Sequence, residues 1–378
     1  MALRTPILVI GPIVGQLQKD LGMSHAVAGL LGTIPILCMG LLAPFGPVLG
    51  ASIGPRLGAA VCVGLIGLFG LIRAIAPETT SVLLATLGMG AGMALVGPIL
   101  SMTVRGRTPD HPAAGTGAYV AGMIIGGSIA AAAVVPLADG LGGWRPAFAV
   151  VAAASMISLA AWLVLLPPDG GGRSRPTLPR IPWRRPSAWL LGLVFAAQST
   201  LFHGSITWLA SAYIERGWSA GQAAGLIAFF NGIGLLASLS VPIFADRIGT
   251  RRTQMTGAAI LAVAGSLGVV LTPGAGAGSA FPFMTTALLG FGIGTFFPLV
   301  LTVPVDIAAE PSEAASLTAL MLLVGYLISS AAPVALGFLR DATGSFDAVL
   351  WALVGIAVVM IPLALSLGQR RLERAGAQ

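Results

Sequence analysis

The sequence predicts an all-α membrane protein, with twelve transmembrane helices arranged as two pseudo-symmetric six-helix bundles. Composition is the first reason: 9% of the 378 residues are charged and 56% are hydrophobic, whereas soluble proteins carry about 25% charged residues. The distribution of the charges is the second reason. They stand in short connectors between apolar runs, because Asp, Glu, Lys and Arg are costly inside lipid. Each run is close to the ~20 residues that a helix needs to cross ~30 Å of hydrocarbon.

The apolar runs define the helices in chain order. The predicted spans are 2–18, 25–49, 57–76, 80–103, 113–138, 146–167, 188–213, 221–244, 254–273, 280–302, 314–338 and 347–368. The first span is short and carries Arg4 near its start. Two interpretations stay open for it, a short span or a span whose natural start lies upstream, and we favour the second.

The longest polar break separates the two halves. Residues 168–187 read PDGGGRSRPTLPRIPWRRPS, a composition typical of a flexible linker. We therefore predict an N-terminal bundle over 1–167, this linker, and a C-terminal bundle over 188–378 with a short basic tail. Most arginines fall on the side of the membrane that holds the linker and both termini, so the positive-inside rule makes that side cytoplasmic. The opposite side holds Lys19, Arg73, Arg145, Arg216 and Arg340.

An internal repeat supports the two halves. A shift of 195 residues brings Pro47 onto Pro242, and the turn IGPR (53–56) onto IGTR (248–251). Membrane folds built from parallel repeats bind their substrate near the bilayer midplane, where the repeats meet. We expect a binding site there.

The segment ADRIGTRR, residues 245–252, follows the second predicted helix of the second half. It resembles the signature of the major facilitator superfamily, a pattern near G-x-x-x-D-R-x-G-R-R, and the resemblance implies a transporter that works by alternating access. Ion pairs at such a turn can hold one state of a gate and break in the other. The predicted gating residues are Asp246, Arg247, Gly249, Arg251 and Arg252. The alternative is a basic cytoplasmic anchor in which the acid serves as a helix cap.

Within that superfamily, the chain is similar to the cyanate and 2-nitroimidazole transporter family over nearly its whole length. The similar segments are LRTPILVIGPI (3–13), GLLGTIPILCMG (29–40), AAQSTLFHGSITWLASAYIERGWS (196–219) and LLVGYLISSAAPVALGFLRDATGS (322–345). The resemblance implies transport of a small anion such as cyanate, or of a related small polar compound. The alternative is efflux of a neutral or weakly basic aromatic compound such as a nitroimidazole drug. Two departures leave the substrate open: residues 2–5 read ALRT where the family has NLRP, and His203 stands where the family often has Tyr.

Polar side chains inside the predicted spans are the candidate substrate-binding residues, because such groups are costly in lipid and mark functional sites. They are Arg4, Gln198, Ser199, His203, Trp208, Asn231 and Tyr326. Arg4 offers a planar, permanently charged fork of donors suited to a small anion, and the resemblance makes it the family's first-helix arginine. The alternative is a snorkelling residue at a cytoplasmic helix end.

The span 188–213 holds the densest polar set. Gln198, Phe202 and Ser205 share one helical face, and His203 lies near the middle of the span. Histidine changes its charge near neutral pH. His203 is therefore a candidate for accepting a proton that travels with substrate, for lining the pocket, or for simply donating to a backbone carbonyl. Gln198 and Trp208 are equally open to a role in helix packing.

Other function classes find little support in the sequence. There is no His or Cys cluster with the spacing of a metal site, no serine elbow and no phosphate-binding loop, so we expect no enzyme, no cofactor and no metal. Gly290, Gly292 and Gly294 form a GxGxG inside an apolar run, where close helix packing is the natural explanation. The net charge of +7 comes from arginines scattered over connectors, so no nucleic acid is expected.

The expected partners are a small-molecule substrate, the lipid bilayer and, if His203 takes that role, a coupled proton. We expect a monomer in a bacterial-type inner membrane, with both termini in the cytoplasm. No carboxylate is predicted in the middle of a span. This argues against a proton-driven drug antiporter, because such antiporters often rely on a carboxylate in the membrane.

Overall fold

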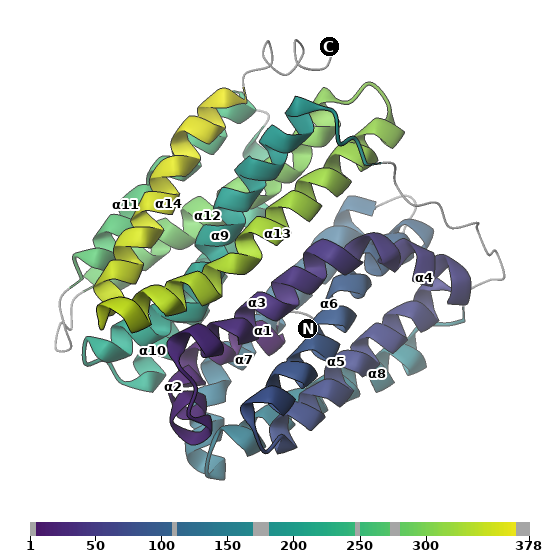
Figure 1. Ribbon diagram of the computed structural model, residues 1–378. Coiled ribbons are helices and arrows are strands. Elements are labelled where there is room, and N and C mark those ends of the chain that lie inside the picture. Colours follow the sequence, from purple (N-terminus) through teal and green to yellow (C-terminus); the bar gives the residue numbers. More distant parts are fainter. Residues whose placement is uncertain (1–4, 108–111, 169–180, 246–249, 273–279, 368–378) are drawn as a thin grey trace. The chain divides into compact units, whose positions relative to one another are not determined.

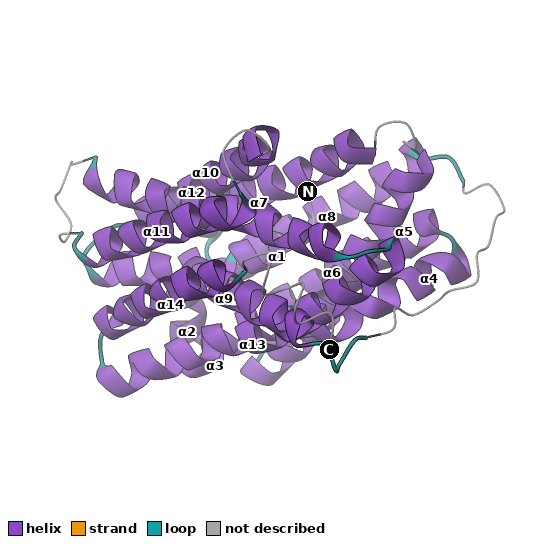
Figure 2. Ribbon diagram, turned by 90° about the horizontal axis from the view of Figure 1, so that it is seen from above, coloured by secondary structure: helices purple, strands orange, loops and turns teal. Residues whose placement is uncertain are grey.

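The computed structural model describes residues 5–107, 112–168, 181–245, 250–272 and 280–367. Throughout these residues the regular structure is helical and no strand occurs (Figure 1 and Figure 2). The chain forms two compact units, Met1–Leu178 (unit 1) and Pro179–Gln378 (unit 2). In the described ranges, 11 helices are long and apolar enough to cross a membrane. The predicted class, an all-α membrane protein, is confirmed.

Unit 1 contains the purple and blue helices of Figure 1. Its elements are α1 (Thr5–Leu8), α2 (Ile10–Leu21), α3 (His25–Leu42), the 3₁₀ turn η1 (Ala43–Phe45), α4 (Gly46–Ile53), α5 (Pro55–Ile75), α6 (Thr79–Arg107), α7 (Pro112–Leu141) and α8 (Trp144–Leu165). The span predicted at 2–18 is therefore divided. Pro12 explains the division, because proline lacks the N–H that would bond to the carbonyl of Leu8 in a continuous helix. Pro47 interrupts the next span at η1 in the same way, by leaving the carbonyl of Ala43 without its helical donor.

Unit 2 contains the teal, green and yellow helices of Figure 1. Its elements are α9 (Pro186–Glu215), α10 (Ala220–Ala245), α11 (Arg251–Val270), α12 (Phe281–Ile307), α13 (Pro311–Thr343) and α14 (Phe346–Ser366). Thr250 caps α11 by accepting a hydrogen bond from the N–H of Thr253 at 3.3 Å. Gly344 ends α13 with a φ of 73°, a conformation that favours glycine, and the chain then reverses into α14.

Glycines set the close packing of α12 on its two neighbours. A methyl group on Gly290 would lie 2.7 Å from the carbonyl oxygen of Phe230 in α10, and one on Gly294 would lie 2.6 Å from Cα of Gly234. A methyl group on Gly292 would lie 2.6 Å from the backbone nitrogen of Ala262 in α11. These helices therefore touch backbone to backbone, as small residues allow in membrane proteins. The interpretation of the GxGxG as a packing motif is confirmed.

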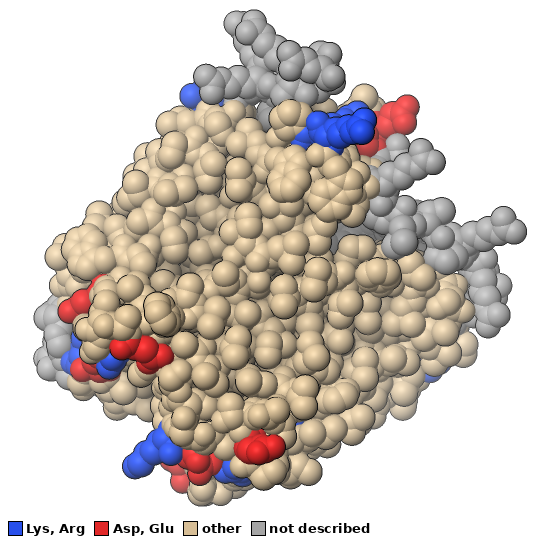
Figure 3. All heavy atoms as spheres, viewed as in Figure 1, with Lys and Arg blue, Asp and Glu red and all other residues tan. Residues whose placement is uncertain are grey.

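Charged side chains collect at helix ends. On the face drawn in Figure 3, the acidic and basic side chains lie in groups, and other residues cover the area between them. In the described ranges every Asp and Glu lies in the first or last turn of a helix, or in a connector. These residues are Asp20, Glu78, Asp139, Glu215, Asp306, Glu310, Glu313, Asp341 and Asp347.

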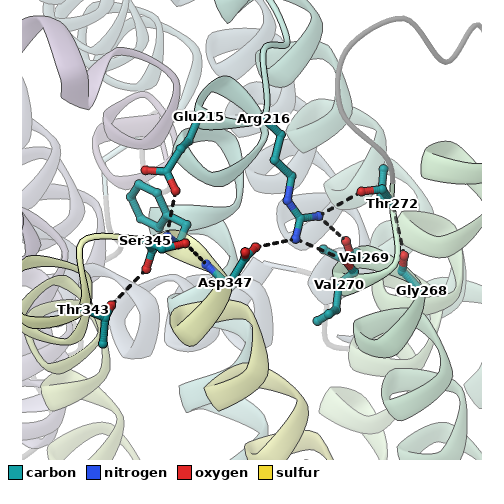
Figure 4. A network of polar contacts seen from close by, with 10 residues as sticks. Glu215, Arg216, Gly268, Val269, Val270, Thr272, Thr343, Ser345 and Asp347 are labelled. Atoms are coloured by element: carbon teal, nitrogen blue, oxygen red, sulfur yellow. Dashed lines mark hydrogen bonds and ion pairs between the residues drawn. The ribbon is translucent and has the colours of Figure 1, made fainter.

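One polar network joins the ends of four helices of unit 2 (Figure 4). Arg216 follows α9 and donates to Asp347 Oδ1 in α14 at 2.8 Å. It also donates to three carbonyl oxygens at and just after the C-terminal end of α11. These belong to Val269 at 2.8 Å, Val270 at 3.1 Å and Thr272 at 3.2 Å. Glu215 accepts from the backbone N–H of Phe346 at 2.8 Å, and from Nε and Nη2 of Arg340 at 3.0 and 2.7 Å.

Candidate functional site

The helix that the sequence marks as richest in polar residues is buried in unit 2. α9 packs against α10, α12, α13 and α14. Its contact with α13 is close because glycines stand there: a methyl group on Gly192 would lie 2.8 Å from Cγ1 of Val324. One on Gly325 would lie 3.0 Å from Cε1 of Phe195. Polar side chains on the facing sides of α9 and α13 are thereby brought within hydrogen-bonding distance.

Ser199 and His203 of α9 meet Ser329 of α13, and we call these three buried residues the Ser–His cluster. Ser199 Oγ donates to Ser329 Oγ at 2.9 Å and lies 3.1 Å from His203 Nδ1. His203 Nδ1 is also 2.8 Å from the carbonyl oxygen of Ser199. Because a carbonyl only accepts, Nδ1 carries the proton, and the lone pair of the neutral ring is at Nε2. The structure therefore contains the hydrogen bond from His203 to a backbone carbonyl that was one of the three sequence-based alternatives.

Helix α13 is continuous beside the Ser–His cluster but lacks one backbone hydrogen bond there. Pro333 has no N–H, so the helical bond to the carbonyl of Ser329 is missing. Trp208 Nε1 donates to the carbonyl of Pro333 at 2.8 Å, and its ring centroid lies 5.7 Å from that of Phe346. Trp208 is fully buried, and its single donor is used in this bond. The geometry favours a packing role for Trp208, which holds α9 against α13 and α14.

Two aromatic side chains contact His203, and two further rings pack on these. The ring centroid of His203 lies 5.2 Å from that of Phe202 and 6.4 Å from that of Tyr326. Phe230 of α10 stacks on Phe202 at 6.1 Å, and Phe195 meets Tyr326 edge to face at 5.1 Å. We call these four residues the aromatic rim. Phe202 and Tyr326 are only half-buried, so the rim presents aromatic surface and a phenol beside the cluster.

The face of α9 that carries Gln198, Phe202 and Ser205 holds unused hydrogen-bonding groups. Gln198 is 3% exposed, and its amide has no hydrogen-bond partner in the described part of the chain. The hydroxyl of Ser205 is buried and likewise without a partner there. Buried polar groups without partners are costly, so both side chains remain candidates for contact with a polar solute. Asn231 is 5% exposed, and its Nδ2 donates to the carbonyl of Ile227 in its own helix at 2.9 Å.

Several predicted site residues lie outside the described residues: Arg4, Asp246, Arg247 and Gly249. Arg251 and Arg252 begin α11. Arg251 Nε lies 3.2 Å from Oδ2 of Asp306, in the last turn of α12. The basic end of the signature is therefore joined to a second helix of unit 2 by an ion pair.

Two of these contacts were not predicted from the sequence. Ser329 lies 130 residues after Ser199, and a serine in an apolar run gives no sign of its partner. The proline four residues later was the available signal, because it breaks the helical bond at this point. The ion pair of Asp306 with Arg251 had no signal either, since nothing local in the sequence links the two residues.

The described residues contain no group of three or more His, Cys, Asp or Glu side chains that could hold a metal ion. Cys38 and Cys62 are buried and free. The groups that the described site offers are hydrogen-bonding side chains, aromatic rings and the imidazole of His203.

The profile of the Major Facilitator Superfamily matches residues 6–333. The chain belongs to this superfamily. It is 28% identical over 356 residues to the cyanate transport protein CynX of Escherichia coli (strain K12), covering 94% of this chain and 91% of that protein. It is 26% identical over 366 residues to the 2-nitroimidazole transporter of the same organism, covering 96% and 91%. Among solved structures, a D-xylose–proton symporter matches with a TM-score of 0.74 at 15% identity, covering 97% of this chain and 94% of that chain.

The protein is therefore a multi-pass membrane transporter and not an enzyme. The similarity to the symporter supports the fold alone, since the identity is low. Members of this superfamily carry small-molecule substrates, and some of them are coupled to protons.

Proposed function

We propose that this transporter moves a small anion, such as cyanate, or a related small polar solute, by alternating access between its two six-helix bundles. The observation that carries the proposal is the amide of Gln198, which has no partner among the described residues and directly precedes Ser199 of the Ser–His cluster. Its N–H groups are hydrogen-bond donors inside a helix of a transporter, where a solute with acceptors could bind them. The names of two relatives, which specify cyanate and 2-nitroimidazole, support a small solute with hydrogen-bond acceptors.

The distribution of charge supports an anion. In the described ranges no carboxylate lies in the middle of a helix, so an anion bound beside the cluster would meet no negative side chain there. It would still need a counter-charge, because an unpaired charge in a protein interior costs several kcal/mol. We propose Arg4 for this role, from its position in the sequence and the family resemblance.

We propose His203 as the site of a coupled proton. With its lone pair at Nε2, the neutral ring can accept a proton and become a cation, and an anion that travels with that proton moves no net charge. Uptake of such an anion would rise when the outside is made more acidic than the inside.

Uptake of radiolabelled cyanate into proteoliposomes tests the proposal. We expect Gln198→Leu to lower uptake at least tenfold, because the substitution keeps the volume and removes the amide; Arg4→Gln should abolish it. Ser266→Ala is the matched control: Ser266 is a buried serine of α11 whose hydroxyl bonds to its own helix at 2.8 Å. Equal uptake by the three variants would refute the anion site.

A second candidate function is efflux of a neutral aromatic compound such as a nitroimidazole, and the aromatic rim favours it. In that case Tyr326→Leu should impair transport, while Arg4→Gln should leave it intact. A deletion strain should also become hypersensitive to 2-nitroimidazole. Increased resistance of the deletion strain would instead indicate uptake.

We propose that the turn around Asp246, Arg247 and Gly249, together with Arg251 and Arg252, forms a cytoplasmic gate. The ion pair between Arg251 and Asp306 supports a gate in which charges join helix ends. We further propose a monomer in a bacterial inner membrane with both termini in the cytoplasm, which the uneven distribution of arginine supports.

A further inference from the structure

Arg73 lies inside unit 1, near the C-terminal end of α5. It is 2% exposed, and its guanidinium carbon lies 4.2 Å from the ring centroid of Phe148 in α8. One turn earlier α5 and α8 are in close contact, since a methyl group on Gly70 would lie 2.9 Å from Cβ of Ala152. Because α5 and α8 approach so closely here, the two helices bury the long side chain of Arg73.

The guanidinium of Arg73 has no acceptor in the part of the chain that the structure describes. Its Nε is buried without a hydrogen-bond partner, and no described carboxylate or carbonyl accepts from its other N–H groups. Arginine remains protonated in proteins, so the group keeps its charge. A buried permanent charge without a counter-charge is strongly unfavourable, and it requires an anion that these residues do not supply.

One acid at this end of unit 1, Asp20, already has partners of its own. Asp20 Oδ2 accepts from Trp144 Nε1 at 3.0 Å and forms an ion pair with Arg145. Arg145 also donates to the carbonyl of Ala76 at 3.3 Å, three residues after Arg73. This end of unit 1 also carries Lys19, Glu78 and Asp139, so the case for an anion rests on the buried guanidinium of Arg73 itself.

Unit 2 shows how a partly exposed arginine with a similar aromatic contact is neutralised. Arg340 lies over the ring of Phe346 with its guanidinium carbon 5.2 Å from the centroid, as Arg73 lies over Phe148. Arg340, however, donates to Glu215 Oε2 from Nε at 3.0 Å and from Nη2 at 2.7 Å. The two arginines share the aromatic contact, whereas Arg73 is more deeply buried and lacks the counter-charge.

We propose that Arg73 and the ring of Phe148 form a binding site for an oxyanion, separate from the Ser–His cluster, and that this oxyanion is the counter-charge of Arg73. The ring covers one face of the guanidinium by a cation–π contact. The N–H groups point outward in the guanidinium plane, and their fork matches a pair of oxygens on a phosphate group. Such a group is available as free phosphate or as the headgroup of an anionic lipid.

Thermal unfolding of the purified full-length protein in a nonionic detergent tests this site. The wild type, Arg73→Met and Arg340→Met are titrated with inorganic phosphate against chloride at constant ionic strength, and separately with phosphatidylglycerol against phosphatidylcholine. A ligand of the folded state raises the unfolding midpoint by mass action. We expect a saturable rise for the wild type and for Arg340→Met, and at least tenfold weaker apparent binding for Arg73→Met. A rise with phosphate assigns a free oxyanion, and a rise with phosphatidylglycerol alone assigns a lipid headgroup.

The proposal is overturned if the wild type responds to neither oxyanion, or if Arg73→Met responds as strongly as the wild type. Arg73→Gln is the second variant, and it must lose the response in the same way. Because solute transport is not measured, the result is independent of whether the transporter carries cyanate.

Discussion

Gly294 is a position where one added methyl group should damage the packing of unit 2. In Gly294→Ala the new Cβ would lie 2.6 Å from Cα of Gly234, which is about 1 Å inside the optimal contact distance. Overpacking costs roughly 1–3 kcal/mol, and the upper end applies because the obstructing atoms belong to the backbone of α10. Alanine recovers about 1 kcal/mol through its helix propensity. We therefore expect a net loss of about 2 kcal/mol in the free energy of unfolding.

Gly355→Ala provides the matched control. Gly355 lies in α14, and a methyl group built on it meets nothing within 4 Å. The propensity term is then the same and the clash is absent, so this variant should equal the wild type or exceed it by about 1 kcal/mol. Unfolding by titration with sodium dodecyl sulfate in mixed micelles should separate the two variants by about 2–3 kcal/mol. A separation below about 0.5 kcal/mol would show that α10 and α12 yield easily, and would refute the reasoning.

Three further predictions concern single polar groups, each measured by the same unfolding titration. Glu215→Gln should lower the free energy of unfolding by about 1–2 kcal/mol, because it weakens charged hydrogen bonds to Arg340 that solvent partly screens; an unchanged value would contradict this. The hydrogen bond from Arg145 lowers the pKa of Asp20 below its ordinary value of 3.8. The ionised Asp20 therefore stabilises the folded state above pH 3.8, and this stabilisation is lost as the pH falls through the lowered pKa. Asp20→Asn should remove this dependence of the free energy of unfolding on acid. Trp208→Phe should cost about 1 kcal/mol and leave transport unchanged; impaired transport would return Trp208 to the substrate site.

The helices and the GxGxG packing motif could be predicted because both depend on residues that are close together in the sequence. A run of apolar residues sets a span, and the GxGxG predicted close helix packing. The structure adds that Gly290 and Gly294 face α10, while Gly292 faces α11. Contacts between distant residues had no such signal. Arg73 was assigned to the side of the membrane from its place along the helix, but its burial depends on a ring of α8. Ser329 likewise became part of the candidate site only through the packing of α9 on α13.

The internal repeat also relates two structural contacts whose residues are not identical in the aligned halves. Asp20 and Glu215 are 195 residues apart, the offset of the repeat, and each lies in the last turn of the helix that precedes a glycine turn. Each also holds the first residue of its unit's last helix. Asp20 accepts from the indole N–H of Trp144 at 3.0 Å, and Glu215 accepts from the backbone N–H of Phe346 at 2.8 Å. Equivalent pairs of helices, α2 with α8 and α9 with α14, are thus each joined through a carboxylate, although the donor groups differ.

This recurrence leads to a test of how independent the two units are. The two links share no residue and belong to separate compact units, so the effects of Asp20→Asn and Glu215→Gln on the unfolding midpoint should add in the double variant. Additivity would mean that each carboxylate secures only the end of its own bundle. A double variant much less stable than the sum of the single effects would show that the two bundle ends support each other. The acid pair would then belong to the machinery that couples the bundles during transport.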